Sequence, residues 1–309
     1  MRILVTGGAG FIGSHIVGHF QGKADVVVLD NLRTGSRANL AGMACEWIEG
    51  SITDRETVRR AVAGADLVFH LAAMVSVPES MEKPIECVGI NATGTLVVLE
   101  EARRAKVRKL CFSSSAAVYG ENPDSPKVET MPVDPRSPYA VTKFDGECYC
   151  QMFQREGWLE TVCLRYFNVF GPRQDPAGAY AAVVPIFIGR ALNGEPLTIH
   201  GDGEQTRDFI HVDDVVRANV HCATTPGLTG VHNVARGSGT TVSELARRIR
   251  DITGSASPIV HAPKRAGDLA HSIADVEKLR AAGFTAQTGI EEALQSTVAS
   301  FAARPGGIL

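Results

Sequence analysis

The segment ILVTGGAGFIG, residues 3–13, decides the fold of this chain. A short apolar run enters a glycine-rich turn, and an amphipathic stretch at residues 12–20 follows it. Gly7 permits the tight turn, Gly10 lets the backbone approach a pyrophosphate, and Gly13 allows the helix to pack closely on the strand. The start of the helix then offers free N–H groups to the phosphates. The pattern predicts a strand, a dinucleotide-binding loop and a helix.

An acidic residue closes the next predicted strand. Asp30 ends the run VVVLD at residues 26–30. A carboxylate at this place can accept hydrogen bonds from the ribose hydroxyls of adenosine and would repel a 2′-phosphate, which favours NAD over NADP. Arg33 lies nearby and could instead neutralise such a phosphate. We predict NAD as the cofactor.

Further apolar runs alternate with amphipathic segments. Strands are predicted at residues 25–30, 47–49, 67–71, 109–113 and 161–166, and helices at residues 55–62, 95–104 and 139–156. Nearly continuous apolar strands between helices imply a parallel sheet that is covered on both faces. The regularity falls after Gly171. We therefore predict an α/β fold, with a Rossmann-type doubly wound sheet over residues 1–170, to which residues 211–235 return, and a smaller C-terminal α+β substrate lobe over residues 171–309.

The composition excludes several classes of function. The net charge of the 309 residues is −3 and no Lys/Arg run appears, so no nucleic-acid partner is predicted. The apolar runs are far shorter than the ~20 residues of a membrane-spanning helix. None of the seven cysteines forms a Cys-x-x-Cys pair, which favours buried thiols over disulfides or metal ligands. We predict no metal site, no membrane contact and a cytoplasmic location.

A phenol and an ammonium lie one helical turn apart in the stretch SPYAVTK, residues 137–143. Tyr139 and Lys143 share one helix face because four residues separate them. A free phenol, with a pKa near ~10, is a poor base at neutral pH, but a nearby ammonium and a positive nicotinamide ring favour the phenolate. Ser115, after the strand predicted at residues 109–113, can hydrogen-bond the reacting oxygen or only form the turn. We predict Tyr139, Lys143 and Ser115 as the catalytic residues.

In combination these motifs resemble the extended short-chain dehydrogenase/reductase family. Two stretches narrow the resemblance to its nucleotide-sugar branch, closest to the UDP-glucose and UDP-N-acetylglucosamine 4-epimerases: GDGEQTRDF at residues 201–209 and RAGD at residues 265–268. The other segments that carry it are the glycine loop, Asp30-Asn31, Leu71-Ala72-Ala73, residues 113–120, the Tyr139/Lys143 pair and residues 165–168. The similarity covers nearly the whole chain.

The resemblance implies a tightly retained NAD and inversion of C4 of a UDP-hexose through a 4-keto intermediate. It implies a cofactor site made of Gly7, Gly10, Phe11, Ile12, Gly13, Asp30, Asn31, Thr34, Gly35, Ser51, Ile52, Leu71, Ala72, Ala73, Asn91, Ser113, Tyr139, Lys143 and Tyr166. It implies a substrate site made of Val77, Ser115, Tyr139, Asn168, Val184, Arg207, Arg265, Asp268 and Ser272. By its position alone, Asn91 could serve the cofactor or merely cap the helix that follows. Family members commonly form homodimers through the helix that carries Tyr139 and its neighbour around residues 92–105.

Three sites in the sequence bear on the activity, the adenine contact and the sugar that the resemblance implies. Dehydratases typically carry an Asp-Glu pair where this chain has Ala116-Ala117, and methyl groups cannot move protons, so 4,6-dehydration is disfavoured. Many relatives have Gly-Asp where this chain has Gly50-Ser51, so Ser51 takes over the contact to adenine or the contact is absent. A nucleotide-sugar reductase or dehydrogenase with exchangeable cofactor remains an alternative, and a non-catalytic NAD-binding regulator has no need of the Tyr139/Lys143 pair. Ser272 leaves room for an N-acetyl group or merely lines a pocket for plain hexoses.

Overall fold

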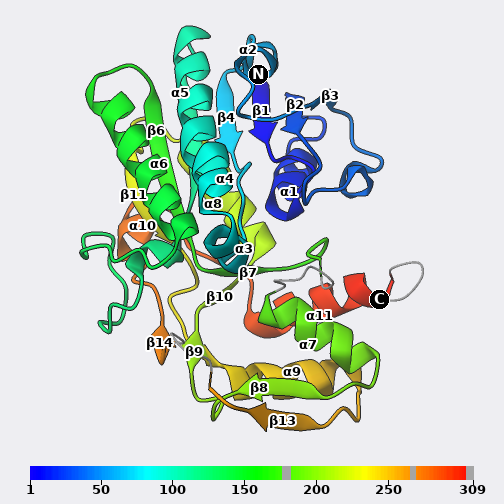
Figure 1. The fold of residues 1–309 in the computed structure, drawn as a ribbon. Helices are drawn as coiled ribbons and strands as arrows, with labels where there is room; N and C mark the ends of the chain where they lie inside the picture. The colour runs from blue at the N-terminus through cyan, green and yellow to red at the C-terminus, as the bar shows by residue number, and fades with distance from the viewer. Residues whose placement is uncertain (176–181, 265–268, 304–309) are drawn as a thin grey trace.

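A seven-stranded parallel sheet forms the centre of the larger part of the molecule, which lies uppermost in Figure 1. The computed structural model describes residues 1–175, 182–264 and 269–303. The strands run in the order β3-β2-β1-β4-β5-β6-β11, and every neighbouring pair is parallel. Their bounds are β1 (Arg2–Thr6), β2 (Asp25–Asp30), β3 (Glu46–Glu49), β4 (Leu67–His70), β5 (Lys109–Ser115), β6 (Glu160–Tyr166) and β11 (Gly230–Val234). The predicted Rossmann-type sheet is confirmed, and the order of its first six strands is that of dinucleotide-binding folds.

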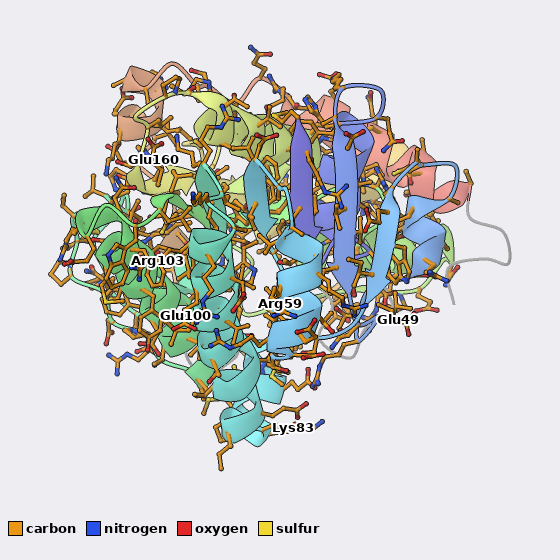
Figure 2. The ribbon with its side chains drawn as sticks, turned by 90° about the horizontal axis from the view of Figure 1, so that it is seen from above. Glu49, Arg59, Lys83, Glu100, Arg103 and Glu160 are labelled. Carbon is orange, nitrogen blue, oxygen red and sulfur yellow. The ribbon has the colours of Figure 1, made fainter. Side chains whose placement is uncertain are left out.

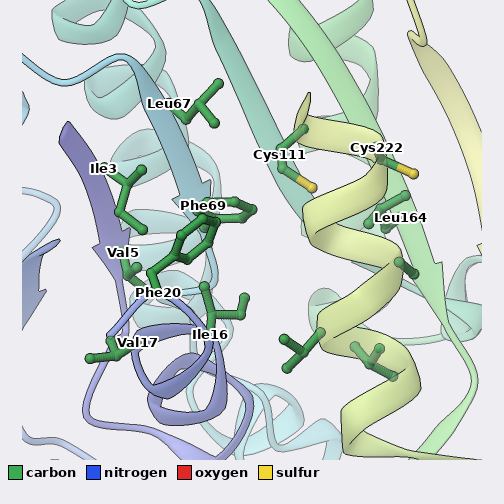
Figure 3. Packing of buried hydrophobic residues seen from close by; sticks show 14 of the residues in the cluster. Ile3, Val5, Ile16, Val17, Phe20, Leu67, Phe69, Cys111, Leu164 and Cys222 are labelled. Atoms are coloured by element: carbon green, nitrogen blue, oxygen red, sulfur yellow. The ribbon is translucent and has the colours of Figure 1, made fainter. Parts of the chain in front are cut away.

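Helices cover both faces of this sheet. On one face lie α1 (Phe11–His19) and α8 (Val212–Thr224), which enclose a core of alternate strand residues (Figure 3). On the other face lie α2 (Arg55–Val62), α5 (Gly94–Arg104) and α6 (Pro138–Arg155). Within β1 the alternation is direct, because Ile3 and Val5 belong to the first core whereas Leu4 belongs to the second. Two hydrophobic layers therefore hold the carboxyl ends of the strands in fixed positions.

The C-terminal part is more regular than the sequence predicted. It contains α7 (Val183–Leu192), α9 (Val242–Thr253) and α11 (Ile290–Ala302), which pack around a separate hydrophobic core with the parallel pair β8 (Leu197–His200) and β13 (Ile259–Ala262). The expected loss of regularity after Gly171 was therefore wrong. Helix α9 even carries a readable signal, since its buried residues Val242, Leu245, Ala246 and Ile249 recur at helical spacing.

Short strands connect the two parts. Strand β7 (Asn168–Phe170) pairs with β10 (Phe209–His211), and β9 (Thr206–Arg207) lies between β12 (Thr240–Thr241) and β14 (His271–Ser272). The chain then returns through α8 to β11, which pairs with β6. As a result, residues far apart in the sequence are brought to the carboxyl edge of the large sheet.

The outer helices carry charges of both signs. Figure 2 labels Arg59 on α2, and Glu100 and Arg103 on α5. The Arg55 guanidinium lies close to the carboxylates of Glu100 and Glu101. Within the described residues, no helix has the length and apolarity needed to cross a bilayer, and no group of three or more His, Cys, Asp or Glu side chains could hold a metal ion.

Candidate active site

A cleft of about 1120 Å³ opens at the carboxyl ends of β1, β4 and β5. Its walls come from the large sheet and from the C-terminal part, since Gly10 and Arg207 both line it. This volume exceeds the ~300–1,000 Å³ that is typical of a pocket for one drug-sized ligand. The cleft is therefore larger than a usual pocket for one drug-sized ligand.

The glycine loop forms the floor of one half of the cleft. Gly7 has φ +70°, a backbone conformation that other residues rarely adopt. A Cβ on Gly13 would lie 2.1 Å from the carbonyl oxygen of Gly7, so no side chain fits there. Helix α1 begins after Gly10, which provides no side-chain cap for the first N–H groups. The uncapped helix start and the closely packed glycines fit a bound pyrophosphate.

Asp30 is placed beside this loop by hydrogen bonds from the backbone. Its carboxylate accepts from the Ala9 N–H at 2.9 Å and from the Leu32 N–H at 2.8 Å. The residue is buried, and it lines the cleft at the end of β2. Each carboxylate oxygen retains a lone pair for a ribose hydroxyl. The arrangement therefore fits the adenosine ribose of NAD.

The predicted catalytic residues meet where α6 begins and β5 ends. Ser137 caps α6 by accepting from the Ala140 N–H at 3.2 Å. The Tyr139 phenol is hydrogen-bonded to Ser115. One turn further along, the Lys143 ammonium donates to the Ser113 carbonyl oxygen at 2.7 Å and lies 5.8 Å from the centre of the Tyr139 ring. Tyr139, Ser115 and Lys143 all line the cleft.

The pKa of Tyr139 is shifted upward by the protein groups around it. Burial raises it above the ordinary value of a phenol, and the hydrogen bond with Ser115 offsets this only in part. Burial also lowers the pKa of Lys143 to about 8. The protein groups alone therefore do not lower the pKa of Tyr139, because burial of the phenol outweighs its hydrogen bond. The expected lowering also depends on a positive nicotinamide ring beside the phenol, and it stays a prediction.

A buried ion pair between α6 and β6 lies next to the catalytic residues. Glu147, the next residue on the Tyr139/Lys143 face of α6, receives two hydrogen bonds from the Arg165 guanidinium, at 2.8 and 2.7 Å. It also accepts from the Ser114 hydroxyl at 2.5 Å. Glu147 and Arg165 are buried. Glu147 was not predicted from the sequence, although its spacing of four residues from Lys143 indicates a shared helix face.

The structure gathers most of the predicted cofactor residues in the cleft. Those that line it are Gly7, Gly10, Phe11, Ile12, Gly13, Asp30, Asn31, Thr34, Gly35, Ser51, Ile52, Leu71, Ala72, Ala73, Ser113, Tyr139, Lys143 and Tyr166. Asn91 is the exception, because it is buried outside the cleft wall. Its amide accepts from the Met74 N–H at 2.7 Å and donates to the Met74 carbonyl at 3.0 Å and to Thr142 Oγ1 at 3.0 Å. Asn91 thus braces the loop after β4 against α6.

The predicted substrate residues form the other half of the cleft. Those that line it are Val77, Ser115, Tyr139, Asn168, Val184, Arg207 and Ser272. Arg207 also donates to the carbonyl oxygens of Thr206 and Leu269, both at 2.8 Å, which holds its side chain in place. Arg265 and Asp268 lie outside the described residues. Further residues line the cleft that were not assigned to the site from the sequence, among them Glu79, Gln174 and Leu269. Arg33, considered from the sequence only as a partner of a 2′-phosphate, and Phe209, at the end of the motif at residues 201–209, line it too.

Comparisons with known proteins agree with this geometry. The model of the NAD dependent epimerase/dehydratase family matches residues 3–235. The structure of a UDP-glucose 4-epimerase from Thermotoga maritima with UDP-glucose is 44% identical, with a TM-score of 0.93, and the alignment covers 98% of this chain and 99% of that one. A UDP-N-acetylglucosamine 4-epimerase from Methanobrevibacter ruminantium, in complex with UDP-N-acetylmuramic acid, is 40% identical, with a TM-score of 0.94 and 98% of both chains covered.

A relative with a different activity has the same fold. The dTDP-glucose 4,6-dehydratase DesIV from Streptomyces venezuelae, solved with NAD bound, is 30% identical, with a TM-score of 0.90, and covers 99% of this chain and 98% of its own. The family model and the glycine loop together identify the cofactor as NAD. This chain belongs to the NAD-dependent epimerase/dehydratase family.

Proposed function

We propose that the chain is a UDP-hexose 4-epimerase. The observation that carries the proposal is the meeting of Tyr139, Ser115 and Lys143 in a cleft whose two halves can hold a dinucleotide and a nucleotide sugar. The similarity to two nucleotide-sugar 4-epimerases over nearly the full length supports the same reaction.

In the proposed mechanism, the protein transfers one proton and hydrogen-bonds the 4-oxygen of the sugar. Bound NAD supplies reversible hydride transfer at C4 of the sugar. Tyr139, as the phenolate, takes the proton of the 4-hydroxyl while the C4–H bond breaks, which leaves a 4-keto sugar. Ser115 donates a hydrogen bond to the 4-oxygen, and Lys143 holds the nicotinamide ribose. When the keto sugar presents its other face, hydride returns to C4 from that side while Tyr139 returns the proton to the 4-oxygen, so the configuration at C4 is inverted.

A positive cofactor ring close to Tyr139 is part of this proposal. The protein groups alone raise the pKa of the phenol, so the electrostatic help for ionisation must come from the bound ligands. We therefore propose that Tyr139 becomes an effective base only in the loaded enzyme. This couples proton transfer to the presence of oxidised cofactor.

The neighbouring alanines favour epimerisation over dehydration. Ala116 and Ala117 follow Ser115 directly and line the cleft. Elimination of water across C5 and C6 needs an acid and a base beside the sugar, and neither alanine can supply one. A nucleotide-sugar 4,6-dehydratase is the second candidate because of the similarity to DesIV.

The identity of the hexose is inferred from residues in the substrate half of the cleft. Ser272 in β14 lines the cleft, and Arg207 lies opposite it in β9. A small side chain at this position leaves space beside the sugar. We propose that UDP-N-acetylhexosamines are accepted alongside the plain UDP-hexoses, with Asn168, Val184 and Arg207 contributing to the UDP-sugar site.

Turnover assays with purified enzyme test these proposals. We expect interconversion of UDP-glucose with UDP-galactose and of UDP-GlcNAc with UDP-GalNAc, without net accumulation of reduced nicotinamide. Release of a 4-keto-6-deoxy sugar would instead identify a dehydratase, and net reduction of added NAD would identify a dehydrogenase. Ser272→Tyr should lower kcat/KM for the N-acetylated pair by about 10-fold or more relative to the plain pair, because the larger ring crowds the pocket. An unchanged ratio would remove Ser272 from the sugar pocket.

Substitution of the phenol tests the mechanism. Tyr139→Phe should reduce turnover by about 10³-fold, within the range for a lost general acid–base, and leave bound NAD in place. Tyr149→Phe is the matched control, because Tyr149 lies on the same helix but packs against the hydrophobic core. Turnover by Tyr139→Phe at the rate of the control would contradict the proposed role.

We further propose a homodimer through α6 and its neighbours α3 (Val77–Glu82) and α4 (Pro84–Val88), whereas the resemblance implies α6 and residues 92–105. Met81 in α3, Ile85 and Val88 in α4, and Val141 in α6 are exposed, with Ile85 88% exposed. Helices α3 and α4 both contact α6, so these side chains belong to neighbouring elements. Light scattering should give the mass of two chains for the wild type and of one chain for Ile85→Glu. A monomeric wild type would refute the dimer.

A further inference from the structure

Two glutamates hold an arginine at the cofactor half of the cleft. Arg33, three residues after Asp30, donates to Glu79 in α3 at 2.7 Å and to Glu86 in α4 at 2.5 Å. The Lys83 ammonium, at the α3–α4 junction (Figure 2), lies 3.6 Å from Glu79. The Arg33 side chain is 28% exposed and that of Glu79 is 22% exposed. We refer to Arg33, Glu79 and Glu86 as the arginine clasp.

The clasp joins elements on opposite sides of the glycine loop. Strands β2 and β4 flank β1 in the sheet. Arg33 follows β2, whereas α3 and α4 follow β4, so the contact reaches from one side of β1 to the other at its carboxyl end. Arg33 and Glu79 both line the cleft together with Gly10. Arg33 and Glu79 therefore lie in the same half of the cleft as Asp30 and the glycine loop, where we expect the adenosine half of the cofactor to bind.

Arg33 is the group with which this segment would otherwise bind NADP. A guanidinium close to the acidic end of the second strand is the usual partner of a 2′-phosphate, since it offers paired donors to phosphate oxygens. In this chain both sides of the guanidinium are occupied by carboxylates. The hydrogen bond to Arg33 also lowers the pKa of Glu86, which keeps this carboxyl charged.

We infer that Glu79 and Glu86 make this chain select NAD over NADP, because they hold the Arg33 guanidinium away from a 2′-phosphate. The negative charge of Asp30 disfavours a 2′-phosphate. Among the residues from β2 to Gly35, Arg33 is the one cation that could offset this repulsion, and the clasp occupies its guanidinium. A phosphate that recruited Arg33 would leave two carboxylates without this partner. NADP thus has to break two ion pairs that NAD leaves intact.

Binding of NAD and NADP to cofactor-free protein tests this inference. The double variant Glu79→Gln/Glu86→Gln releases Arg33, and the affinity for NADP relative to NAD should rise at least about 10-fold over the wild type. Adding Arg33→Ala to the double variant should return the ratio to within about 3-fold of the wild type. The control Glu56→Gln/Glu100→Gln also removes two carboxylates from ion pairs with arginines, on α2 and α5, and should leave the ratio unchanged.

The outcomes separate the clasp from simpler explanations. An unchanged ratio in the folded double variant would overturn the inference. A gain that persists in the triple variant would also overturn it, because loss of negative charge alone would then explain the effect. Thermal melting shows whether the double variant folds. If it does not fold, Glu86→Gln alone takes its place, and a smaller rise in the NADP-to-NAD affinity ratio is expected. Because no sugar is present, a negative result leaves the proposed epimerase activity untouched, and a failed epimerase assay leaves this result valid.

Discussion

The two halves of the cleft are built in different ways. The cofactor half has a floor of backbone, because the glycine loop and the start of α1 come from one continuous stretch of eleven residues, 3–13. The sugar half is made of side chains from β7, β9, β14 and α7, which are far apart in the sequence. One steric clash in the backbone floor can disrupt ligand binding in the first half. In the second half, side-chain contacts can be removed one at a time by substitution. Tyr139 and Ser115 lie between them.

This difference has consequences for specificity. A site formed by backbone N–H groups recognises a pyrophosphate that many ligands share, so selection among dinucleotides falls to Asp30 and the arginine clasp. A site formed by side chains can change its ligand through single substitutions such as those at Ser272.

Among changes that separate the two halves, the largest expected effect on ligand affinity comes from the backbone of the cofactor half. In Gly13→Ala, the new Cβ would lie 2.1 Å from the Gly7 carbonyl oxygen and 2.8 Å from the Gly8 Cα. Overpacking of this kind costs about 3 kcal/mol, so NAD affinity should fall about 100-fold. Gly89→Ala is the control, since nothing lies within 4 Å of its added Cβ. Calorimetric titration with NAD measures both, and an affinity in Gly13→Ala equal to the control would contradict a preformed floor.

A smaller effect is expected from one side chain of the sugar half. Arg207→Gln removes a guanidinium from the cleft, and a charge-assisted hydrogen bond is worth about 1.5–3 kcal/mol, so KM for the UDP-sugar should rise about 10- to 100-fold. Bound NAD should be retained, because Arg207 belongs to the other half. Arg190→Gln on α7 provides the control, as this guanidinium bonds to Thr198 and Pro196 instead. Loss of NAD in Arg207→Gln would show that the halves are not independent.

The smallest effect is a pH dependence of stability at the end of β4, directly before the residues Leu71, Ala72 and Ala73 that line the cofactor half. His70 at the end of β4 is buried between the hydroxyls of Thr6 and Thr95, at 2.7 and 3.0 Å. Burial, and secondly the charge of Lys143, lower the pKa of His70 from 6.5 to about 3. Between pH 6.5 and 3 the unfolded chain binds this proton and the folded chain does not, so stability falls as the pH falls. The slope should reach about 1 kcal/mol per pH unit near pH 5.

Denaturant unfolding of the NAD-free protein at pH 7, 6 and 5 measures this slope. The other histidines titrate in wild type and variant alike, so the difference between wild type and His70→Gln isolates the contribution of His70. We expect the variant to lose less stability than the wild type over this range. Equal slopes would mean that the folded protein accommodates a charged His70, and that the Thr6–His70–Thr95 contact is not rigid.

The motifs predicted the cofactor half in detail because its contacts are local. Asp30 and Gly13 could be placed from spacing alone, since a strand, a tight turn and a helix leave few geometries for the loop. Tyr139 and Lys143 could be paired because a helix repeats its faces every three to four residues. The long helices α9 and α11 were not predicted individually, even though α9 has the required periodicity, because only an α+β lobe of lower regularity was expected after Gly171.

By itself, the sequence determined the parallel sheet, the glycine loop, the position of Asp30 at the end of β2 and the shared helix face of Tyr139 and Lys143. All of these follow from short-range stereochemistry. Only the tertiary structure decided that burial raises the pKa of Tyr139, that Asn91 braces the loop after β4, and that Arg33 is held by two glutamates. These properties depend on which distant segments meet and on how much water they exclude, and residue spacing along the chain carries neither kind of information.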